Sequence, residues 1–320
     1  MASLLKVLDR NIELMTELSV GYVFHLGLKH GLFGNLVAGK SCEEILASTP
    51  LPNKARLREL VKTYISLGIV KGAGCTFEQA GFSYEFRLTP EDAGLLLPDW
   101  VQILDEIYKM ADYAFISQEH PKVLMDFDRG ADFWDMRLMT EINRLSRRLA
   151  VELTGIEDGM RVLDLGCGSV SPVEIGEAVG PNGKYVGVDF SPGLMSIANT
   201  RVRNSRMDWV VLKEMDIRKI LPRNTYDAVI MSFVLEYVEN PEAVVRKALD
   251  LLDPGAKLVI IEPFRDMYPA APALEFFESL TPEFAGFPAT SQIISAVEGS
   301  PHDTKVETYG KSAVVVTKRA

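Results

Sequence analysis

The stretch that decides the fold is RVLDLGCGSVSPVEIGEAVGPNGKYVGVDFSPGLMSIAN, residues Arg161 to Asn199. It begins with a short apolar run, Val162 to Leu165, which is typical of a strand buried on both faces of a parallel sheet. Gly166 and Gly168 follow this run. Their missing side chains allow the backbone to turn sharply and to approach a ligand closely.

The second half of the stretch completes a βαβ unit. A helix is expected over about residues 173–179, because the glycines and the proline that follow it stop a helix. A second strand, Lys184 to Val188, ends at Asp189, and Ser191-Pro192 opens the next helix. Such a unit binds an adenosine-bearing cofactor at the carboxyl ends of its strands, where an acid accepts hydrogen bonds from the ribose hydroxyls.

The glycine pattern separates two classes of cofactor site. A dinucleotide site expects a third glycine, and Ser171 stands at that position. The stretch instead resembles motif I of class I S-adenosylmethionine (SAM) methyltransferases, commonly D-x-G-x-G-x-G. Asp164, Gly166 and Gly168 match this motif, and Val170 replaces its last glycine.

The remainder of the chain continues the resemblance in order. Apolar runs predict strands over about 209–212, 226–231 and 257–261, with a helix at about 241–252 between the last two. Two β-rich runs, Lys305 to Tyr309 and Ser312 to Lys318, flank Gly310-Lys311 and predict a hairpin. The resemblance therefore implies an α/β fold, a Rossmann-like seven-stranded SAM methyltransferase domain at 156–320.

The resemblance also implies which residues hold SAM. Asp189 would accept the ribose hydroxyls, and Asp216 would meet the adenine amino group. The complete expected set is Asp164, Gly166, Cys167, Gly168, Asp189, Phe190, Asp216, Ile217, Ser232 and Phe233. Cys167 reads as a small residue of the turn, because a reactive thiol would need an acidified and exposed environment.

Composition limits the remaining function classes. The 320 residues are 47% hydrophobic, and no apolar run reaches the ~20 residues that a membrane helix needs. The net charge of −10 argues against general affinity for nucleic acid or for an anionic membrane. Three widely spaced cysteines suggest neither a disulfide framework nor a metal site. A cytoplasmic protein is expected.

The N-terminal part, residues 1–95, predicts a mostly helical winged-helix domain. Residues 2–32 read as helical, with a break at Gly21. Shorter helices are expected after Ser41 and after Asn53, followed by two strands near 68–70 and 84–88. A winged helix binds DNA or mediates dimerisation. The order of elements resembles the N-terminal domain of small-molecule O-methyltransferases of the caffeate type and their bacterial relatives, which implies a homodimer.

Residues 96–155 are expected to form bridging helices over 98–114 and 132–154. They are rich in aromatic residues, and flat acceptors suit aromatic walls. The resemblance assigns these helices to the roof of the acceptor pocket, whereas the plainer interpretation is an interdomain core. The aromatic residues are Trp100, Tyr108, Tyr113, Phe115, Phe127, Phe133 and Trp134.

A hydroxyl acceptor gains from a base that removes its proton. Caffeate-type enzymes use a histidine after strand four, in an L-H-D-W pattern, and Glu236 stands at that position here. Glu236 serves as a base if burial raises its pKa, and otherwise lines the methionine end of SAM. Glu262 matches a supporting carboxylate of the family, and His120 is the best-placed histidine on the acceptor side.

The sequence thus predicts a SAM-dependent methyltransferase that acts on a small acceptor, aromatic or otherwise flat. The resemblance favours O-methylation, and the missing histidine keeps C-, N- and S-methylation open. Two alternatives remain: an inactive SAM-binding regulator or scaffold, and a non-methylating SAM-dependent enzyme on the same fold.

Overall fold

The computed structural model describes residues 1–71, 78–79, 87–117, 125–222 and 224–319. The chain divides into two compact units. Unit 1 comprises Met1–Asp9, Val123–Met267 and Glu283–Ala320, and unit 2 comprises Arg10–Lys122 and Tyr268–Pro282. The second half of the predicted bridging region therefore falls in unit 1 and most of its first half in unit 2.

Unit 1 is built on a seven-stranded sheet with the strand order β5-β4-β3-β6-β7-β9-β8. Its strands are β3 (Arg161–Leu165), β4 (Lys184–Asp189), β5 (Val210–Glu214), β6 (Tyr226–Ser232), β7 (Leu252–Ile261), β8 (Thr304–Tyr309) and β9 (Ala313–Lys318). Neighbouring strands from β5 to β7 pair in parallel, whereas β9 runs antiparallel to both β7 and β8. The predicted seven-stranded α/β domain with its terminal hairpin is confirmed.

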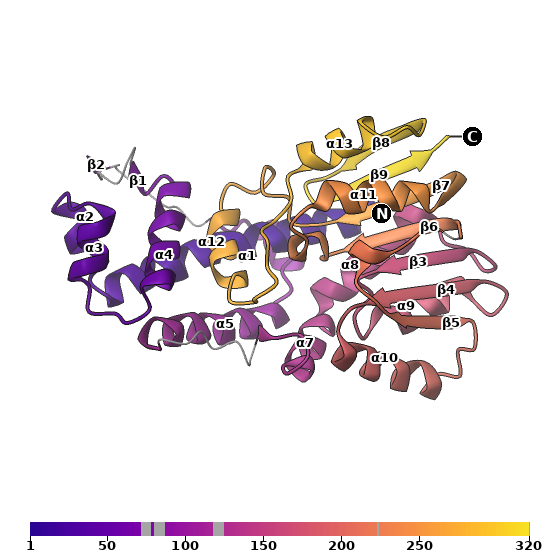
Figure 1. Ribbon diagram of the computed structural model, residues 1–320, viewed down its shortest axis with the longest axis horizontal. Helices are drawn as coiled ribbons and strands as arrows, with labels where there is room; N and C mark the ends of the chain where they lie inside the picture. Colours follow the sequence, from indigo (N-terminus) through magenta and orange to yellow (C-terminus); the bar gives the residue numbers. More distant parts are fainter. Residues whose placement is uncertain (72–77, 80–86, 118–124, 223, 320) are drawn as a thin grey trace. The chain divides into compact units, whose positions relative to one another are not determined.

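Helices cover both faces of this sheet (Figure 1). On one face lie α8 (Glu141–Thr154), α9 (Ser171–Val179) and α10 (Pro192–Asn204), which pack on β3 to β7 or on each other. On the other face, α11 (Pro241–Asp250) and α13 (Thr290–Glu298) pack together over β7 and β8. The central strands β3, β4 and β6 are buried over most of their length because both faces of the sheet are covered, whereas the edge strands β5 and β8 are partly exposed.

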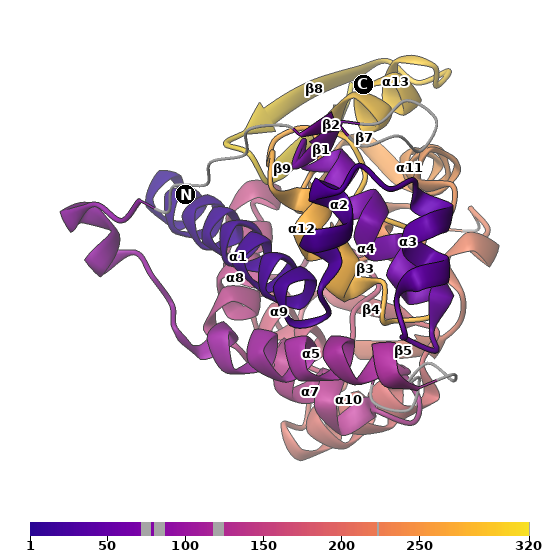
Figure 2. The same ribbon diagram turned by 90° about the vertical axis from the view of Figure 1, so that its left-hand side faces the viewer.

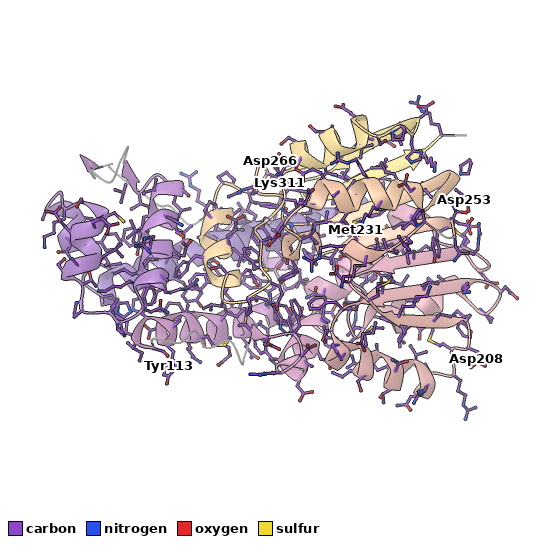
Figure 3. The ribbon with its side chains drawn as sticks, viewed as in Figure 1. Tyr113, Asp208, Met231, Asp253, Asp266 and Lys311 are labelled. Atoms are coloured by element: carbon purple, nitrogen blue, oxygen red, sulfur yellow. The ribbon has the colours of Figure 1, made fainter. Side chains whose placement is uncertain are left out.

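Polar residues next to the strands distinguish the amino ends of the parallel strands from their carboxyl ends. Asp253, near the start of β7, accepts hydrogen bonds from Arg161 and Thr225 at the amino ends of the strands. Figure 3 shows Asp266 and Lys311 at the opposite end of unit 1, where β6 and β7 finish. The carboxyl ends of the parallel strands are thus the end at which a ligand is expected.

Unit 2 is mostly helical. It contains the larger part of α1 (Ala2–Lys29), followed by α2 (Leu32–Val37), α3 (Cys42–Ser48), α4 (Lys54–Ser66), β1 (Val70–Lys71), β2 (Glu78–Gln79), the 3-10 turn η1 (Pro90–Gly94), α5 (Asp99–Ile116) and α12 (Ala271–Glu278). Figure 2 shows α3 beside α4. Ser41 forms the predicted capping box with Glu44, and Asn53 caps α4.

Three expectations are corrected, and three helices were not expected. Gly21 does not break the first helix, which continues to Lys29 because tertiary packing on both sides outweighs one unfavourable residue. The expected helix over 132–154 is two helices, α7 (Ala131–Leu138) and α8, separated at Met139–Thr140. β7 begins at Leu252, five residues before the predicted start, through a bulge opposite β6. α2, α12 and α13 had no counterpart in the sequence analysis.

The expected strand at 84–88 lies largely outside the described residues. The partner of Val70–Lys71 in the structure is Glu78–Gln79. His120, with residues 118–124, is also outside the described part of the chain.

Candidate functional site: a glycine turn and a buried carboxyl pair at the carboxyl end of the sheet

The predicted glycine turn joins β3 to α9. Gly166 adopts a φ of +78° and Gly168 a φ of +57°, both in the left-handed region that glycine tolerates. A Cβ on Gly166 would lie 2.8 Å from the Cβ of Val234, and a Cβ on Gly168 would lie 2.7 Å from Leu138 Cδ1. The turn therefore needs glycine at both positions for conformation and for space.

Asp189 ties this turn to the end of β4. Its Oδ2 accepts a hydrogen bond from the Gly168 amide at 2.9 Å, and its Oδ1 accepts one from the Ser191 amide at 3.0 Å. Burial raises the pKa of Asp189, and these backbone hydrogen bonds oppose the rise. A carboxylate has about four lone-pair sites, so Asp189 can still accept a further hydrogen bond, as from a ribose hydroxyl.

Asp216 lies beyond the end of the neighbouring strand, β5. The Met215 amide donates to the Asp189 carbonyl at 2.8 Å, which holds the start of this segment beside β4. The Asp216 carboxylate caps the 3-10 turn η2 (Ile217–Lys219) and accepts the Arg218 guanidinium. The hydrogen bond from Arg218 lowers the pKa of Asp216. An adenine amino group would share this carboxylate with Arg218.

Asp164 lies under the turn, inside β3. It is buried and accepts a hydrogen bond from the Tyr185 hydroxyl at 2.6 Å. Burial raises the pKa of Asp164 to about 7 and raises that of the Cys167 thiol. Cys167 is therefore an unreactive buried thiol, and Asp164 binds the neighbouring strand β4 through Tyr185 instead of facing solvent.

The segment after β6 carries Ser232, Phe233 and Glu236. Ser232 donates to the hydroxyl of Ser146 on α8 at 3.4 Å, and Phe233 has a left-handed φ of +52°. Glu236 lies in the 3-10 turn η3 (Leu235–Tyr237) and is buried. Glu262, fully buried after β7, accepts hydrogen bonds from the amides of Val234 at 2.9 Å and Leu235 at 2.8 Å, directly before Glu236 in the chain. The structure thus brings Glu262 to the segment that carries Glu236.

Sequence reasoning missed a polar cluster that holds α7 beside the glycine turn. Asp135 accepts a hydrogen bond from the Ser169 hydroxyl at 2.5 Å and a two-pronged ion pair from Arg201 on α10. Arg147 donates to the Leu138 carbonyl at 2.9 Å and to Glu174 at 2.6 Å. These contacts join residues 9 to 66 positions apart, so no local pattern signals them.

Aromatic side chains gather at the same end of the sheet. The rings of Phe127 and Trp134 stack at 4.3 Å, and Tyr237 meets the edge of both. We call this group the aromatic cluster; its members are Phe127, Trp134, Phe190, Tyr237, Phe284 and Phe287. The aromatic residues singled out in the bridging region are divided between the units. Trp100, Tyr108, Tyr113 and Phe115 belong to unit 2, and Phe127, Phe133 and Trp134 belong to unit 1.

Within the described ranges, no group of three or more His, Cys, Asp or Glu side chains is arranged to hold a metal ion. The described helices include none with the length and apolar character needed to cross a membrane.

Part of this chain matches a known protein family, and several known proteins are similar to it. A family model described as a methyltransferase domain matches residues 156–285. The uncharacterized protein MJ0906 of Methanocaldococcus jannaschii is 29% identical over 98% of this chain and 87% of its own length. The ubiquinone/menaquinone biosynthesis C-methyltransferase UbiE of Pseudomonas putida is 30% identical, over 46% of this chain and 59% of its own length.

A solved structure agrees with the fold. The CurJ carbon methyltransferase covers 96% of this chain, and 91% of that chain is covered in turn, with a TM-score of 0.65 and 16% sequence identity. At this identity the likeness concerns the fold alone. Three observations indicate the same activity: the domain match over residues 156–285, the methyltransferase relatives, and the glycine turn with an acid at the end of the next strand. The protein is a SAM-dependent methyltransferase.

Proposed function

We propose that the protein methylates a small, planar acceptor that carries a ring hydroxyl, with a ring carbon as the favoured acceptor atom. The aromatic cluster is the observation that carries this proposal. Phe190 directly follows Asp189, and Tyr237 directly follows Glu236, so the cluster joins the cofactor-binding end of β4 to the buried carboxyl pair. Flat rings bind aromatic side chains by stacking and edge contacts.

The residues of unit 1 supply the binding of SAM in this proposal. Asp189 accepts the ribose hydroxyls, Asp216 and Ile217 hold the adenine, and the backbone of Gly166 to Gly168 approaches the methionine part. Asp164 and Cys167 support the turn from below, while Phe190, Ser232 and Phe233 line the site. The place of Asp189 supports this assignment, because it ends β4 and accepts the Gly168 amide of the glycine turn.

When bound, SAM supplies an electrophilic methyl group, and the protein has to align the acceptor with it. A base that removes the ring hydroxyl proton leaves a phenolate, whose negative charge is shared between oxygen and ring carbons. The same base therefore serves O- and C-methylation, and alignment decides between them. The Pseudomonas putida relative is a C-methyltransferase of ubiquinone and menaquinone biosynthesis, which supports carbon as the acceptor atom.

We also propose a cytoplasmic homodimer in which unit 2 contributes the interface. The order α3, α4, β1 and β2 is that of a winged helix, which supports the predicted dimerisation domain. Large apolar side chains exposed on unit 2 are consistent with such an interface; they are Leu28, Ile65, Leu88, Val101, Tyr113 and Ile116.

Methyl-labelled SAM tests the proposed reaction. The enzyme is incubated with SAM that carries a ¹³C methyl group and with a panel of hydroxylated naphthoquinols, benzoquinols and simple phenols. Mass spectrometry detects methylated product, and the ¹³C chemical shift separates a C-methyl from an O-methyl group. We expect C-methylated quinol. An O-methyl product would restore the O-methylation expected from the sequence, and SAM binding without product over the panel would favour a regulator.

A further inference from the structure

We propose that Arg147, a buried arginine on α8, binds the methionine carboxylate of SAM through its Nη2 atom. The inference rests on the part of the proposed function that assigns SAM to unit 1, and it is independent of the acceptor. It is carried by a buried guanidinium nitrogen that has no hydrogen-bond partner among the described residues.

Three arginines lie on α8, and one of them is buried. Arg144 and Arg148 are exposed, whereas Arg147 is 4% exposed. Because a guanidinium is always charged at neutral pH, its burial costs free energy unless partners surround it. An apolar side chain of similar size would often pack at such a position with no loss of stability. The buried arginine therefore indicates a need for its charge and its donors.

The hydrogen bonds of Arg147 use two of its three nitrogen atoms. Nε donates to the Glu174 carboxylate at 2.6 Å, and Nη1 donates to the Leu138 carbonyl at 2.9 Å. Nη2 is buried and has no partner in the part of the chain that the structure describes. Because a buried charged donor without an acceptor is costly, the donors of Nη2 are expected to receive an acceptor from a ligand.

Two contacts place Arg147 at the carboxyl ends of β3 and β6, which are parallel neighbours in the sheet. Leu138, whose carbonyl holds Nη1, also covers the glycine turn, since a Cβ on Gly168 would lie 2.7 Å from Leu138 Cδ1. Ser146, directly before Arg147, contacts the hydroxyl of Ser232, the last residue of β6, at 3.4 Å. Arg147 thus lies beside the loop that approaches the methionine part of SAM in the proposed function.

Glu174 balances the charge of Arg147 only in part. Its side chain is 29% exposed, and its carboxylate also lies 3.5 Å from the Arg144 guanidinium, which pairs with Glu141 as well. Burial raises the pKa of Asp164, the buried acid of β3, to about 7, so Asp164 carries only part of a negative charge at neutral pH. Arg147 therefore keeps positive charge for a second anion.

The methionine part of SAM offers one group that fits Nη2. This part carries an α-carboxylate, an α-ammonium and the sulfonium, and the carboxylate is its one anionic acceptor of hydrogen bonds. Arginine binds carboxylates through short charge-assisted hydrogen bonds. The contacts of Nε and Nη1 hold the guanidinium in place before SAM binds, which reduces the entropy lost on binding. Arg147 is therefore a cofactor-binding residue in addition to those expected from the sequence.

Calorimetry with SAM and with decarboxylated SAM tests the role of Arg147. Decarboxylated SAM keeps the adenosine, the sulfonium and the amine but lacks the carboxylate. Arg147→Met is expected to weaken the binding of SAM by about 10- to 100-fold, because charge-assisted hydrogen bonds are lost. The same variant should bind decarboxylated SAM within about twofold of the unmodified protein, because that ligand makes no contact for the substitution to remove.

Two further variants complete the test. Arg148→Met is the matched control, because Arg148 is the next residue of α8 and is exposed, and it should leave both affinities unaltered. Arg147→Lys keeps a positive charge beside Glu174 but loses the planar fork of donors. It should weaken SAM binding less than Arg147→Met does, and it decides the question if the methionine variant does not fold. Thermal unfolding of each variant shows that it is folded before the titration.

An equal loss of affinity for SAM and for decarboxylated SAM would show that Arg147 only supports the fold around the turn, and it would overturn the inference. Unchanged SAM affinity in a folded Arg147→Met variant, or no SAM binding by the unmodified protein, would overturn it as well. SAM binding with the expected difference between the two ligands, but without methylated product over the acceptor panel, would contradict the proposed acceptor and support the role of Arg147.

Discussion

At the scale of single residues, buried carboxyl groups dominate the chemistry of unit 1. Asp164, Asp189, Glu236 and Glu262 are each at most 6% exposed, although isolated charges are costly to bury. Their hydrogen-bond partners differ: Asp164 accepts from the Tyr185 hydroxyl, whereas Asp189 and Glu262 accept from backbone amides. The four groups are therefore expected to respond differently to substitution.

Asp189→Ala should weaken SAM binding by on the order of 2–3 kcal/mol, because two charge-assisted hydrogen bonds to the ribose are lost. Isothermal titration calorimetry with SAM measures the change. Asp208→Ala, on an exposed residue before β5, is the matched control and should leave the affinity unaltered. Equal affinity of the Asp189→Ala variant and the unmodified protein would remove Asp189 from the cofactor site.

Asp164 predicts a pH dependence of stability. The pKa of Asp164 is about 7 in the folded protein, against an ordinary value of 3.8. Between these two pH values the folded protein therefore keeps a proton on Asp164 that the unfolded chain has released. The free energy of unfolding should therefore fall as pH rises from about 4 to 7, by at most about 4 kcal/mol.

Asp164→Asn keeps an acceptor for the Tyr185 hydroxyl and has no proton to release. Urea unfolding at several pH values should show a shallower decline with pH than in the unmodified protein. The same slope in both proteins would contradict the raised pKa of Asp164.

At the scale of elements, α7 depends on partners that lie far away in the sequence. Asp135 connects this helix to Ser169 in the glycine turn and to Arg201 on α10, and Leu138 covers Gly168. The ion pair is partly buried, since the side chains of Arg201 and Asp135 are 29% and 17% exposed. The helix is thus anchored to the loop that approaches SAM.

Asp135→Ala should lower the free energy of unfolding by about 1–3 kcal/mol, because Ser169 and Arg201 lose their shared acceptor. It should also weaken SAM binding, since the turn loses a support, and both effects are measured on one preparation by urea unfolding and calorimetry. Asp132→Ala on the exposed side of α7 is the control. A loss of stability equal to that of the control would show that the cluster contributes nothing to holding α7.

At the scale of the whole molecule, α1 begins in unit 1 and continues in unit 2, and residues 268–282 leave unit 1 for unit 2. Asp9 binds the β8–β9 turn of unit 1, and Arg10 pairs with Asp92 at 2.7 Å within unit 2. Leu8, Val23 and Leu26 of α1 are completely buried within a single chain. Deleting the N-terminal helix would therefore disrupt the fold of the single chain. A loss of dimer in such a variant would not show that the helix forms the interface.

The intact chain provides a cleaner test of the proposed dimer. Light scattering should give about twice the chain mass of 35.5 kDa. Leu28→Glu, at a side chain that is 62% exposed on α1, should reduce this mass if the residue lies in the interface, because a charge is costly to bury. Leu221→Glu on unit 1 is the matched control at 59% exposure. A monodisperse monomer at micromolar concentration would contradict the homodimer.

The sequence by itself determined the βαβ unit, the seven strands of the sheet, the terminal hairpin and the SAM-dependent chemistry. Its signals are local: apolar runs, glycines at Gly166 and Gly168, the cap at Ser191, and an acid at the end of each of two strands. The tertiary structure decided what spacing along the chain does not record. It placed Glu262 against the Leu235 amide, Asp135 against Arg201 and Tyr237 against Phe127, because these partners meet only when separate strands and helices reach the same end of the sheet.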